Sequence, residues 1–431
     1  MKEYSKEELI SKQKEYLMPA VHTSFDEPLC IERGKGEFLY DVDGKKYIDF
    51  YAGIMVVVSG HCNEKITKAA EDQMEKIQHS SAFFINHSVV ELAEKLSRIT
   101  PGELKQSFFV NSGSEAVERA VNLSQIYTGK NTVIGLMHGY HGITLLARTL
   151  TSGSVWRIGE TNVPNVRYTP NAYCYRCPFG ATPENCDMAC ARYLENIIQT
   201  QTPGEIACVV AETMQGVGGL ITPPDDYFKV LAEITRRYGG LLIIDEVQSG
   251  FGRTGGKMFA IEHYGVEPDI MAMAKGIANG FPLGAFIAKE KIAGCFDGPS
   301  VSTFGGNPVS AAAAVANIEY IEENDILSHC EKMGVLLKEK FLQLKEKYDI
   351  IGDVRGRGLF WGLELVKDRK TKEPAWEEAG KMMQLCKDEG LIIGMSGSSF
   401  HVLRLGPPLN ISKDSIEEGV KIMDNAFSRL K

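Results

Sequence analysis

Two ionisable side chains stand at the ends of apolar segments in the middle of the chain. Asp245 follows the segment 241–244, and Lys275 follows the segment 270–274. A lysine removed from water loses basicity, so its amine becomes a nucleophile that can form an imine with an aldehyde. Each residue alone also fits a structural role, Asp245 as a helix N-cap and Lys275 as a surface lysine. Together they indicate a site in which Lys275 holds an aldehyde carbon and Asp245 pairs with a ring nitrogen.

A third apolar segment, at 108–110, is followed by small polar residues that could bind an anion. Asn111, Ser112, Gly113 and Ser114 follow it, and the pattern then becomes helical. Backbone N–H groups at the start of a helix bind phosphate readily, and the hydroxyls add donors. The same residues also fit a serine capping box without a ligand. A phosphate site here is therefore one of two interpretations.

A fourth apolar segment, at 132–137, comes shortly before Gly139, Tyr140, His141 and Gly142. The glycines let the backbone turn, and a tyrosine at this place could stack on a flat ring. In isolation, a loop with a packed tyrosine explains these residues better.

Short apolar strands alternate with amphipathic helices around these residues, which predicts an α/β fold with a mainly parallel sheet. Several strands are continuously apolar, as expected where helices cover both faces of a sheet. Ligands bind such sheets at the carboxyl ends of the strands, where the polar residues above lie. Strands are predicted at 106–111, 132–137, 206–212, 241–245, 270–274, 284–288, 361–366 and 401–405, with a hairpin at 37–51 and helices at 1–20, from 64 and at 307–323.

The length of 431 residues predicts a large and a small domain. We expect 1–65 and 326–431 to form one small domain and 66–325 the large one. The net charge of −9 disfavours nucleic acid as a partner. An N-terminal segment without an apolar core predicts no signal peptide, and no apolar stretch is long enough for a membrane span, so we expect a soluble, cytoplasmic protein.

Four of the ten cysteines form a cluster with a spacing that suits a metal. Cys174 and Cys177 are followed by Cys186 and Cys190, a C-x2-C and a C-x3-C pair. The two prolines of this loop, Pro178 and Pro183, would let it fold without a metal ion. We therefore expect no metal, with a zinc site on these four cysteines as the weaker alternative.

As a set, the motifs of this chain resemble those of the class III (subgroup II) aminotransferases of fold type I, which depend on pyridoxal 5'-phosphate. The pattern is most similar to the alanine–glyoxylate and ω-amino-acid–pyruvate enzymes of that family. The resemblance implies a large domain with a mainly parallel seven-stranded sheet and a small α+β domain from both termini. It rests on FFVNSGSEA at 108–116, GYHG at 139–142, QGVGG at 215–219, LLIIDEVQSGFGRTG at 241–255, AKGIANGFPLGA at 274–285, STFGGNP at 302–308, GDVRGRGL at 352–359 and LRLGPPL at 403–409.

The resemblance also implies roles for single residues, and a homodimer with shared active sites that could pair into a tetramer. Lys275 and Asp245 are the expected catalytic residues, with Lys275 as the Schiff-base lysine. Arg404 is expected to bind the substrate carboxylate, and Thr303 to reach the phosphate of the neighbouring subunit. The remaining cofactor contacts are expected from Ser112, Gly113 and Ser114 at the phosphate, Tyr140 and Val247 on the two ring faces, Gln248 at the phenolic oxygen, and His141 and Glu212 nearby.

The chain departs from family members that use γ-aminobutyrate or ornithine at two positions that bear on the substrate. Those members carry an arginine and a glutamate where this chain has Ile143 and Val217. A distal carboxylate is therefore less well served, and we expect a pyruvate- or glyoxylate-sized acceptor. An apolar wall is expected from Ile54, Phe83, Phe84 and Ile143. Thr213 replaces the usual proline, with no evident consequence.

The predicted function is a ping-pong transfer of an amino group from a small amino acid or ω-amine, such as alanine, β-alanine or taurine, to pyruvate or glyoxylate. Racemisation or epimerisation, ammonia or phosphate elimination, and transamination with 2-oxoglutarate need the same lysine and aspartate and stay open as alternatives. A protein that only binds the cofactor is disfavoured, because all the catalytic residues are present.

Overall fold

The computed structural model describes residues 4–21, 23–159, 163–182 and 184–430. A seven-stranded sheet forms the centre of the large domain, in the order β4-β10-β9-β8-β7-β5-β6. The strands β9, β8, β7, β5 and β6 are parallel, and β10 is antiparallel to both of its neighbours. The bounds are β4 Leu104–Val110, β5 Val133–Leu136, β6 Val166–Thr169, β7 Cys208–Glu212, β8 Leu241–Asp245, β9 Ile270–Met273 and β10 Gly284–Lys289.

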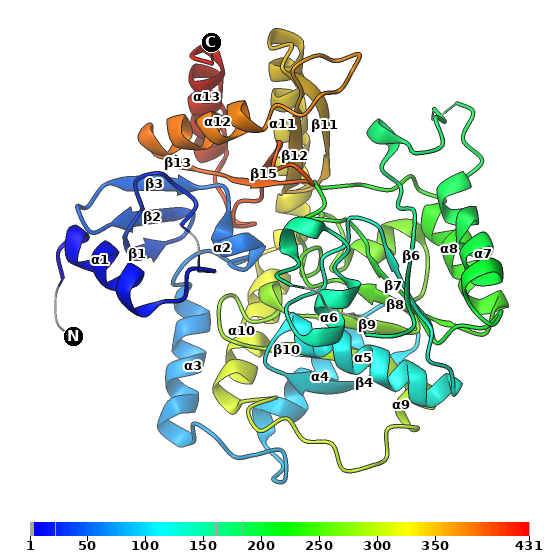
Figure 1. Ribbon diagram of the computed structural model, residues 1–431. Helices are drawn as coiled ribbons and strands as arrows, with labels where there is room; N and C mark the ends of the chain where they lie inside the picture. Colours follow the sequence, from blue (N-terminus) through cyan, green and yellow to red (C-terminus); the bar gives the residue numbers. More distant parts are fainter. Residues whose placement is uncertain (1–3, 22, 160–162, 183, 431) are drawn as a thin grey trace.

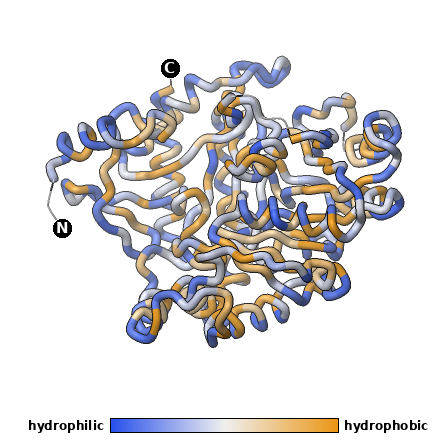
Figure 2. The backbone as a smooth tube through the Cα atoms, turned by 60° about the horizontal axis from the view of Figure 1, so that its bottom comes forward, coloured by the Kyte–Doolittle hydropathy of each residue, from blue (hydrophilic) through white to orange (hydrophobic). Residues whose placement is uncertain are grey.

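Side chains of this sheet enter two hydrophobic cores, one on each face. Along β8, Ile243 packs with residues of α5, whereas Leu242 and Ile244 pack in the cluster that holds residues of α7, α8 and α10. Because alternate residues of a strand point to opposite faces, a strand covered on both faces must be apolar throughout. Figure 1 shows the sheet between these helices, and Figure 2 shows the hydrophobic residues gathered along the central strands.

Two four-stranded sheets build the rest of the molecule. One contains β1 Ile31–Lys35, β2 Phe38–Asp41, β3 Lys46–Asp49 and β13 Leu391–Ile392, and the other contains β11 Ile351–Arg357, β12 Phe360–Leu365, β15 Val402–Leu405 and β14 Gly394–Ser396. The strand β13 pairs with β3 in parallel, so the N-terminal and C-terminal parts share one sheet (Figure 1). This pairing agrees with a small α+β unit made from both termini.

The helices begin close to their predicted positions. Asn63 caps the helix that starts at Glu64, and Asn307 caps the Ala-rich helix that starts at Pro308. The bounds are α1 Lys6–Tyr16, α2 Ala52–Met55, α3 Glu64–Lys76, α4 His87–Ile99, α5 Gly113–Thr128, α6 Leu145–Leu150, α7 Ala189–Gln201, α8 Tyr227–Arg237, α9 Glu290–Ala293, α10 Pro308–Glu323, α11 Ile326–Lys347, α12 Trp376–Asp388 and α13 Lys413–Ser428. Among the described residues, no helix is both long and apolar enough to cross a membrane.

Candidate active site

A cavity of about 370 Å³ lies at the carboxyl ends of the central strands and collects most of the predicted site residues. Strands β4, β5, β7, β8 and β9 all contribute residues that stand at or just after their ends. The predicted residues that line it are Ser112, Gly113, Ser114, Tyr140, His141, Ile143, Glu212, Asp245, Val247, Gln248 and Lys275.

Lys275 opens a single 3₁₀ turn directly after β9. Its backbone has a φ of +49°, a left-handed conformation that few residues other than glycine adopt. The pKa of Lys275 is lowered to about 8, first by burial and then by the Arg404 cation, while the charges of Asp245 and Glu212 oppose this shift. A sizeable fraction of the amine is therefore neutral near physiological pH, as a nucleophile requires.

Asp245 ends β8 and is held by two hydrogen bonds. Its Oδ2 accepts from Nδ1 of His141 at 2.7 Å, and its Oδ1 accepts from the backbone N–H of Val247 at 3.0 Å. Burial alone would lower the pKa of His141, but the hydrogen bond and charge of Asp245 raise it above its ordinary value. The pair fixes the carboxyl group of Asp245 at the cavity, and no helix begins at Asp245 that it could cap.

The start of α5 combines both interpretations of the serine-rich segment. The Ser112 side chain accepts from the N–H of Glu115 at 3.2 Å, and Oε2 of Glu115 accepts from the N–H of Asn111 at 2.7 Å. The Ser112 cap leaves the first-turn N–H groups of Gly113 and Ser114 without partners in the helix, because no residue precedes them by a full turn. An anion can therefore bind at a helix start that is already capped.

Gly142 directly follows Tyr140 and His141, and its position requires glycine. Its φ is +132°, and a Cβ at this position would stand 2.1 Å from Oγ of Ser114. That serine oxygen accepts from the N–H of Ile143 at 3.0 Å. The Tyr140 loop and the start of α5 thus fit together only with glycine at 142.

Glu212 ties the Tyr140 loop to the loop after β7. Its carboxylate accepts from the N–H groups of Tyr140, at 2.8 Å, and Gly216, at 3.2 Å. Burial raises the pKa of Glu212 to about 7, while the nearby His141 opposes that rise. Glu212 therefore acts on the cavity mainly by holding the tyrosine in place.

Arg404 lies buried on β15 and points its guanidinium toward Gln248. Its Nη2 donates to Oε1 of Gln248, which leaves the amide nitrogen of Gln248 free to donate into the cavity. In the sheet, Arg404 pairs with Gly362 and Gly394, so neither strand partner places a side chain beside it. Arg404 is not among the residues that line the cavity, but it contacts Gln248, which does line it.

Thr213 acquires a clear structural role. Its Oγ1 donates to Oε1 of Glu246 at 2.7 Å, and Ser249 donates to the other oxygen at 2.6 Å. Glu246 also accepts from the N–H groups of Ala260 and Ile261, and burial raises its pKa to about 7. The threonine hydroxyl that replaces proline thus completes the partners of a buried carboxyl group.

Some predicted residues lie outside the cavity of a single chain. Ile54 is 45% exposed and Phe84 is 71% exposed, and neither lines the cavity; Thr303 is also exposed. In their place, Val56 and the loop 281–283 contribute apolar surface. Residues 281–283 belong to the motif at 274–285 that carries the family resemblance, whereas Val56 follows the short helix α2 and has no local signal in the sequence.

The four clustered cysteines meet at a second, smaller cavity of about 100 Å³. All four are free thiols, and burial raises the pKa of Cys190 to about 12. Among the described residues, no group of three or more histidine, cysteine or acidic side chains is arranged to hold a metal ion. The alternative of a zinc site at Cys174, Cys177, Cys186 and Cys190 therefore gains no support, since the spacing alone did not bring the sulfur atoms into a ligand geometry.

Comparison with known proteins decides the family. Residues 20–427 match the model of the family "Aminotransferase class-III". The chain is a class III aminotransferase. Enzymes of this class depend on pyridoxal 5'-phosphate, so the chain is a pyridoxal-phosphate-dependent aminotransferase of fold type I.

Relatives of this aminotransferase carry two kinds of name. It is 40% identical to alanine–glyoxylate aminotransferase 2 homolog 2 of Arabidopsis thaliana, over 98% of the chain and 87% of that protein. It is also 38% identical to a leucine/methionine racemase of Thermococcus litoralis, over 98% and 96%. Among solved structures, a Bacillus anthracis aminotransferase matches with a TM-score of 0.93 and 31% identity over 100% of both chains.

A structure with bound cofactor also matches. An amine transaminase from an uncultivated Pseudomonas species, in a form described as PLP-bound, has a TM-score of 0.90 and 30% identity over 96% of this chain and 99% of that one. The family and its cofactor are therefore established for this chain, whereas the relatives' names divide between transamination and racemisation.

Proposed function

We propose that this aminotransferase attaches pyridoxal 5'-phosphate to Lys275 and transfers an amino group from a small amino acid or ω-amine to pyruvate or glyoxylate. One observation carries the proposal: a lysine with a pKa of about 8 shares a cavity with the hydrogen-bonded pair Asp245–His141. A nucleophilic amine and a fixed carboxylate are the two groups that such a cofactor needs at opposite ends of its ring.

The described residues fit the cofactor. The N–H groups of Gly113 and Ser114 would hold the phosphate, since α5 begins at the cavity. A Cβ at Gly113 would stand 3.0 Å from both methyl groups of Val247, so glycine keeps this edge open. Tyr140 and Val247 would face the ring, and the free amide nitrogen of Gln248 would donate to its phenolic oxygen.

When bound, pyridoxal 5'-phosphate supplies an aldehyde that takes up an amine and a ring that accepts electrons from the substrate carbon. Asp245, with His141 behind it, would keep a proton on the ring nitrogen. Lys275 would move a proton at its Nζ to and from the substrate carbon, a role that suits its lowered pKa. Arg404 would bind the substrate carboxylate with its fork and release Gln248 in part. We expect ping-pong kinetics.

Two positions support the choice of acceptor. Ile143 lines the cavity with an apolar side chain, and Val217, which is not among the lining residues, is apolar and buried. Neither position offers a cation or a switchable carboxylate for a second, distal carboxylate. This favours pyruvate and glyoxylate over 2-oxoglutarate, because a missing charge in a buried site is not cheaply replaced.

Racemisation is the second candidate, favoured by the racemase and epimerase names among the relatives. It needs a proton donor on the ring face opposite the lysine. Of the ionisable side chains that line the described cavity, Asp245 and His141 bind each other, and Glu212 accepts two backbone N–H groups. Tyr140 remains as the candidate donor, and burial raises the pKa of its phenol, so it would give up its proton less readily than a free tyrosine.

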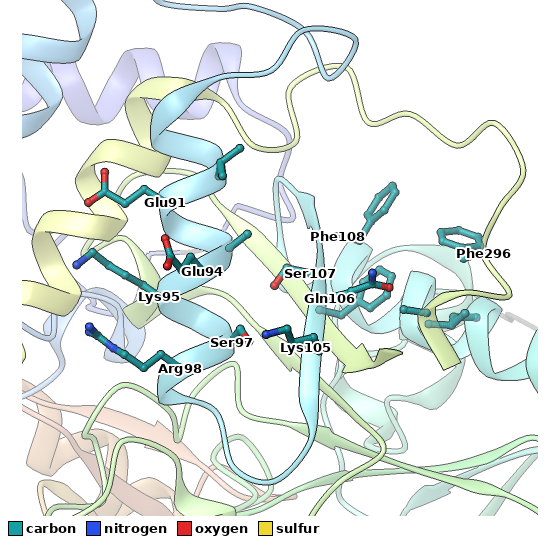
Figure 3. A pocket seen from close by; sticks show the side chains of 15 residues that line it. Glu91, Glu94, Lys95, Ser97, Arg98, Lys105, Gln106, Ser107, Phe108 and Phe296 are labelled. Carbon is teal, nitrogen blue, oxygen red and sulfur yellow. The ribbon is translucent and has the colours of Figure 1, made fainter. Parts of the chain in front are cut away.

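A homodimer is part of the proposal. Phe83, Phe84, Ile85 and Phe304 are all more than half exposed, which suggests a covered surface in the assembly. A groove of about 1030 Å³ beside α4 and the edge strand β4 points the same way. Figure 3 shows charged side chains of α4 along one wall and Phe108 and Phe296 on the other. In such a dimer, Thr303 of one protomer would complete the phosphate site of the other, and Ile54 and Phe84 would supply pocket walls.

A half-reaction panel tests the function. Holoenzyme is mixed with L-alanine, β-alanine or taurine, and the visible absorbance of the bound aldehyde form is followed. A donor should bleach the absorbance, and pyruvate or glyoxylate should restore it more rapidly than 2-oxoglutarate. Interconversion of alanine, leucine or methionine enantiomers without any oxo acid would instead support the racemase, and loss of ammonia or phosphate would support a lyase.

A further inference from the structure

A polar residue lies where the Ala-rich helix α10 should be uniformly apolar. Asn317 is completely buried, and its neighbours Ala313, Ala314 and Ala316 are buried as well. Asparagine is a poor helix former, and a buried amide must find hydrogen-bonding partners. The side chain of Asn317 therefore has to be explained by what it binds.

Asn317 binds the turn that carries the nucleophilic lysine. Its Nδ2 donates to the carbonyl of Gly276 at 2.8 Å and to that of Ile277 at 3.2 Å. Its Oδ1 accepts from Oγ of Ser59 at 2.7 Å. Both carbonyls belong to the residues directly after Lys275, so the amide holds the peptide units on which the lysine depends.

That turn has an unfavourable backbone at both ends. Lys275 has a φ of +49° and Asn279 a φ of +47°. Such conformations persist only where the surroundings hold them. Asn279 supplies the second attachment, since its Oδ1 accepts from the N–H of Ser59 at 2.8 Å and its Nδ2 donates to the carbonyl of Gly60 at 3.0 Å. Two amide side chains thus fasten the turn to α10 and to residues 59–60.

A relaxed turn would change the chemistry of the lysine. With an ordinary negative φ at Lys275, the side chain would leave β9 in another direction. Its amine would then lose the surroundings that lower its pKa to about 8. A more basic amine is less often neutral at physiological pH, and so reacts more slowly with an aldehyde.

We propose that Asn317 is a positioning residue for the reaction. It holds the strained turn so that Nζ of Lys275 reaches the cavity and stays shielded from solvent. The proposal rests on the attachment of the cofactor to Lys275 stated above. It differs from a purely structural role of Asn317, in which loss of the amide would weaken the fold without altering the lysine.

The chain offers a matched control for this distinction. Gln73 in α3 is also buried, its Nε2 donates to the carbonyl of Ile77 at 3.0 Å, and its Oε1 accepts from Oγ of Ser88 at 2.9 Å. The amide thus makes the same kinds of hydrogen bond as Asn317, but none of them reaches the turn that carries Lys275. Asn317→Leu and Gln73→Leu each remove one such amide.

The experiment measures cofactor attachment to apoprotein. Pyridoxal 5'-phosphate is added to wild type and both variants over a range of pH, and the rate is read from visible absorbance and from borohydride trapping on the Lys275 peptide. For Asn317→Leu we expect a rate at neutral pH lower by about tenfold or more and a rate–pH midpoint above that of wild type. Gln73→Leu should lower Tm without changing either quantity.

Two results would overturn the proposal. One is an Asn317→Leu rate and midpoint equal to those of wild type; the other is an equal change in Gln73→Leu at matched loss of Tm. If Asn317→Leu does not fold, Ser59→Ala replaces it, because it removes the hydroxyl that orients the amide. It should raise the midpoint by less, and an unchanged midpoint would contradict the proposal. Failure of wild type to be trapped on Lys275 would instead refute the proposed function, before any variant is compared.

Discussion

The candidate active-site cavity and the cysteine cavity both gather residues with a chemical spacing, but the surrounding structure holds those residues in different ways. In the first, Asp245 and Lys275 follow buried strands, and each has a partner or an altered pKa. In the second, four cysteines lie on and around a loop between β6 and α7, with no ligand geometry among the described residues. Strand ends in a packed sheet place side chains accurately, whereas spacing along a loop does not.

The largest effect is expected from Lys275→Ala. Removal of the amine abolishes covalent attachment and the proton transfer, so turnover should fall by about 10⁴-fold. The measurement is steady-state transamination, together with borohydride trapping. If borohydride still trapped the cofactor on the Lys275→Ala variant, another lysine would have to bind the cofactor. The contrast between the active-site cavity and the cysteine cavity would then lose its basis.

A smaller loss is expected from Asp245→Asn. An amide cannot hold a proton on the ring nitrogen by charge, so kcat should fall by about 10² to 10³-fold while the cofactor still binds. Absorbance of the holoenzyme and kcat are compared at equal cofactor loading. An undiminished kcat would mean that the Asp245–His141 pair only supports the fold.

Arg404→Gln should affect substrates with a carboxylate selectively. Loss of a fork–carboxylate contact should raise KM for alanine by about 10²-fold. An amine without a carboxylate gives the internal control, because its kcat/KM should stay within about threefold of the wild-type value if Arg404 binds only that group. Equal losses for both substrates would contradict this role.

The pH dependence of attachment should reflect the altered lysine. Burial lowers the pKa of Lys275 from 10.5 to about 8, so the neutral amine predominates above about pH 8 and is lost below it. The rate of cofactor attachment to wild-type apoprotein should therefore rise with pH and level off above a midpoint near 8. A midpoint close to 10.5 would show that the lysine stays in water.

The smallest effect is expected at the cysteine cavity. Cys174→Ser and Cys186→Ser should leave kcat/KM within about twofold of wild type, and the purified protein should hold less than about a tenth of an equivalent of zinc. Metal analysis and steady-state kinetics test this together. If the wild-type protein held one equivalent of zinc and the substitutions removed it, the cysteine cavity would be a metal site, and the contrast between the two cavities would fail.

Much of the fold and site could be read from local patterns. The strand Leu241–Asp245 and the helix starts at Glu64 and Gly113 follow from runs of apolar residues and capping side chains, which act over a few neighbouring positions. The short strand β6 was missed, because it carries polar residues and its identity comes from pairing with β5. The antiparallel direction of β10 likewise has no local signal.

The sequence by itself determined which residues are proposed to carry the chemistry, since Lys275, Asp245 and the serines of α5 each stand at a recognisable strand end or helix start. Only the tertiary structure decided their partners. His141 meets Asp245 across 104 positions, and Arg404 meets Gln248 across 156. Contacts between residues so far apart depend on how the layers pack, and no periodicity along the chain encodes them.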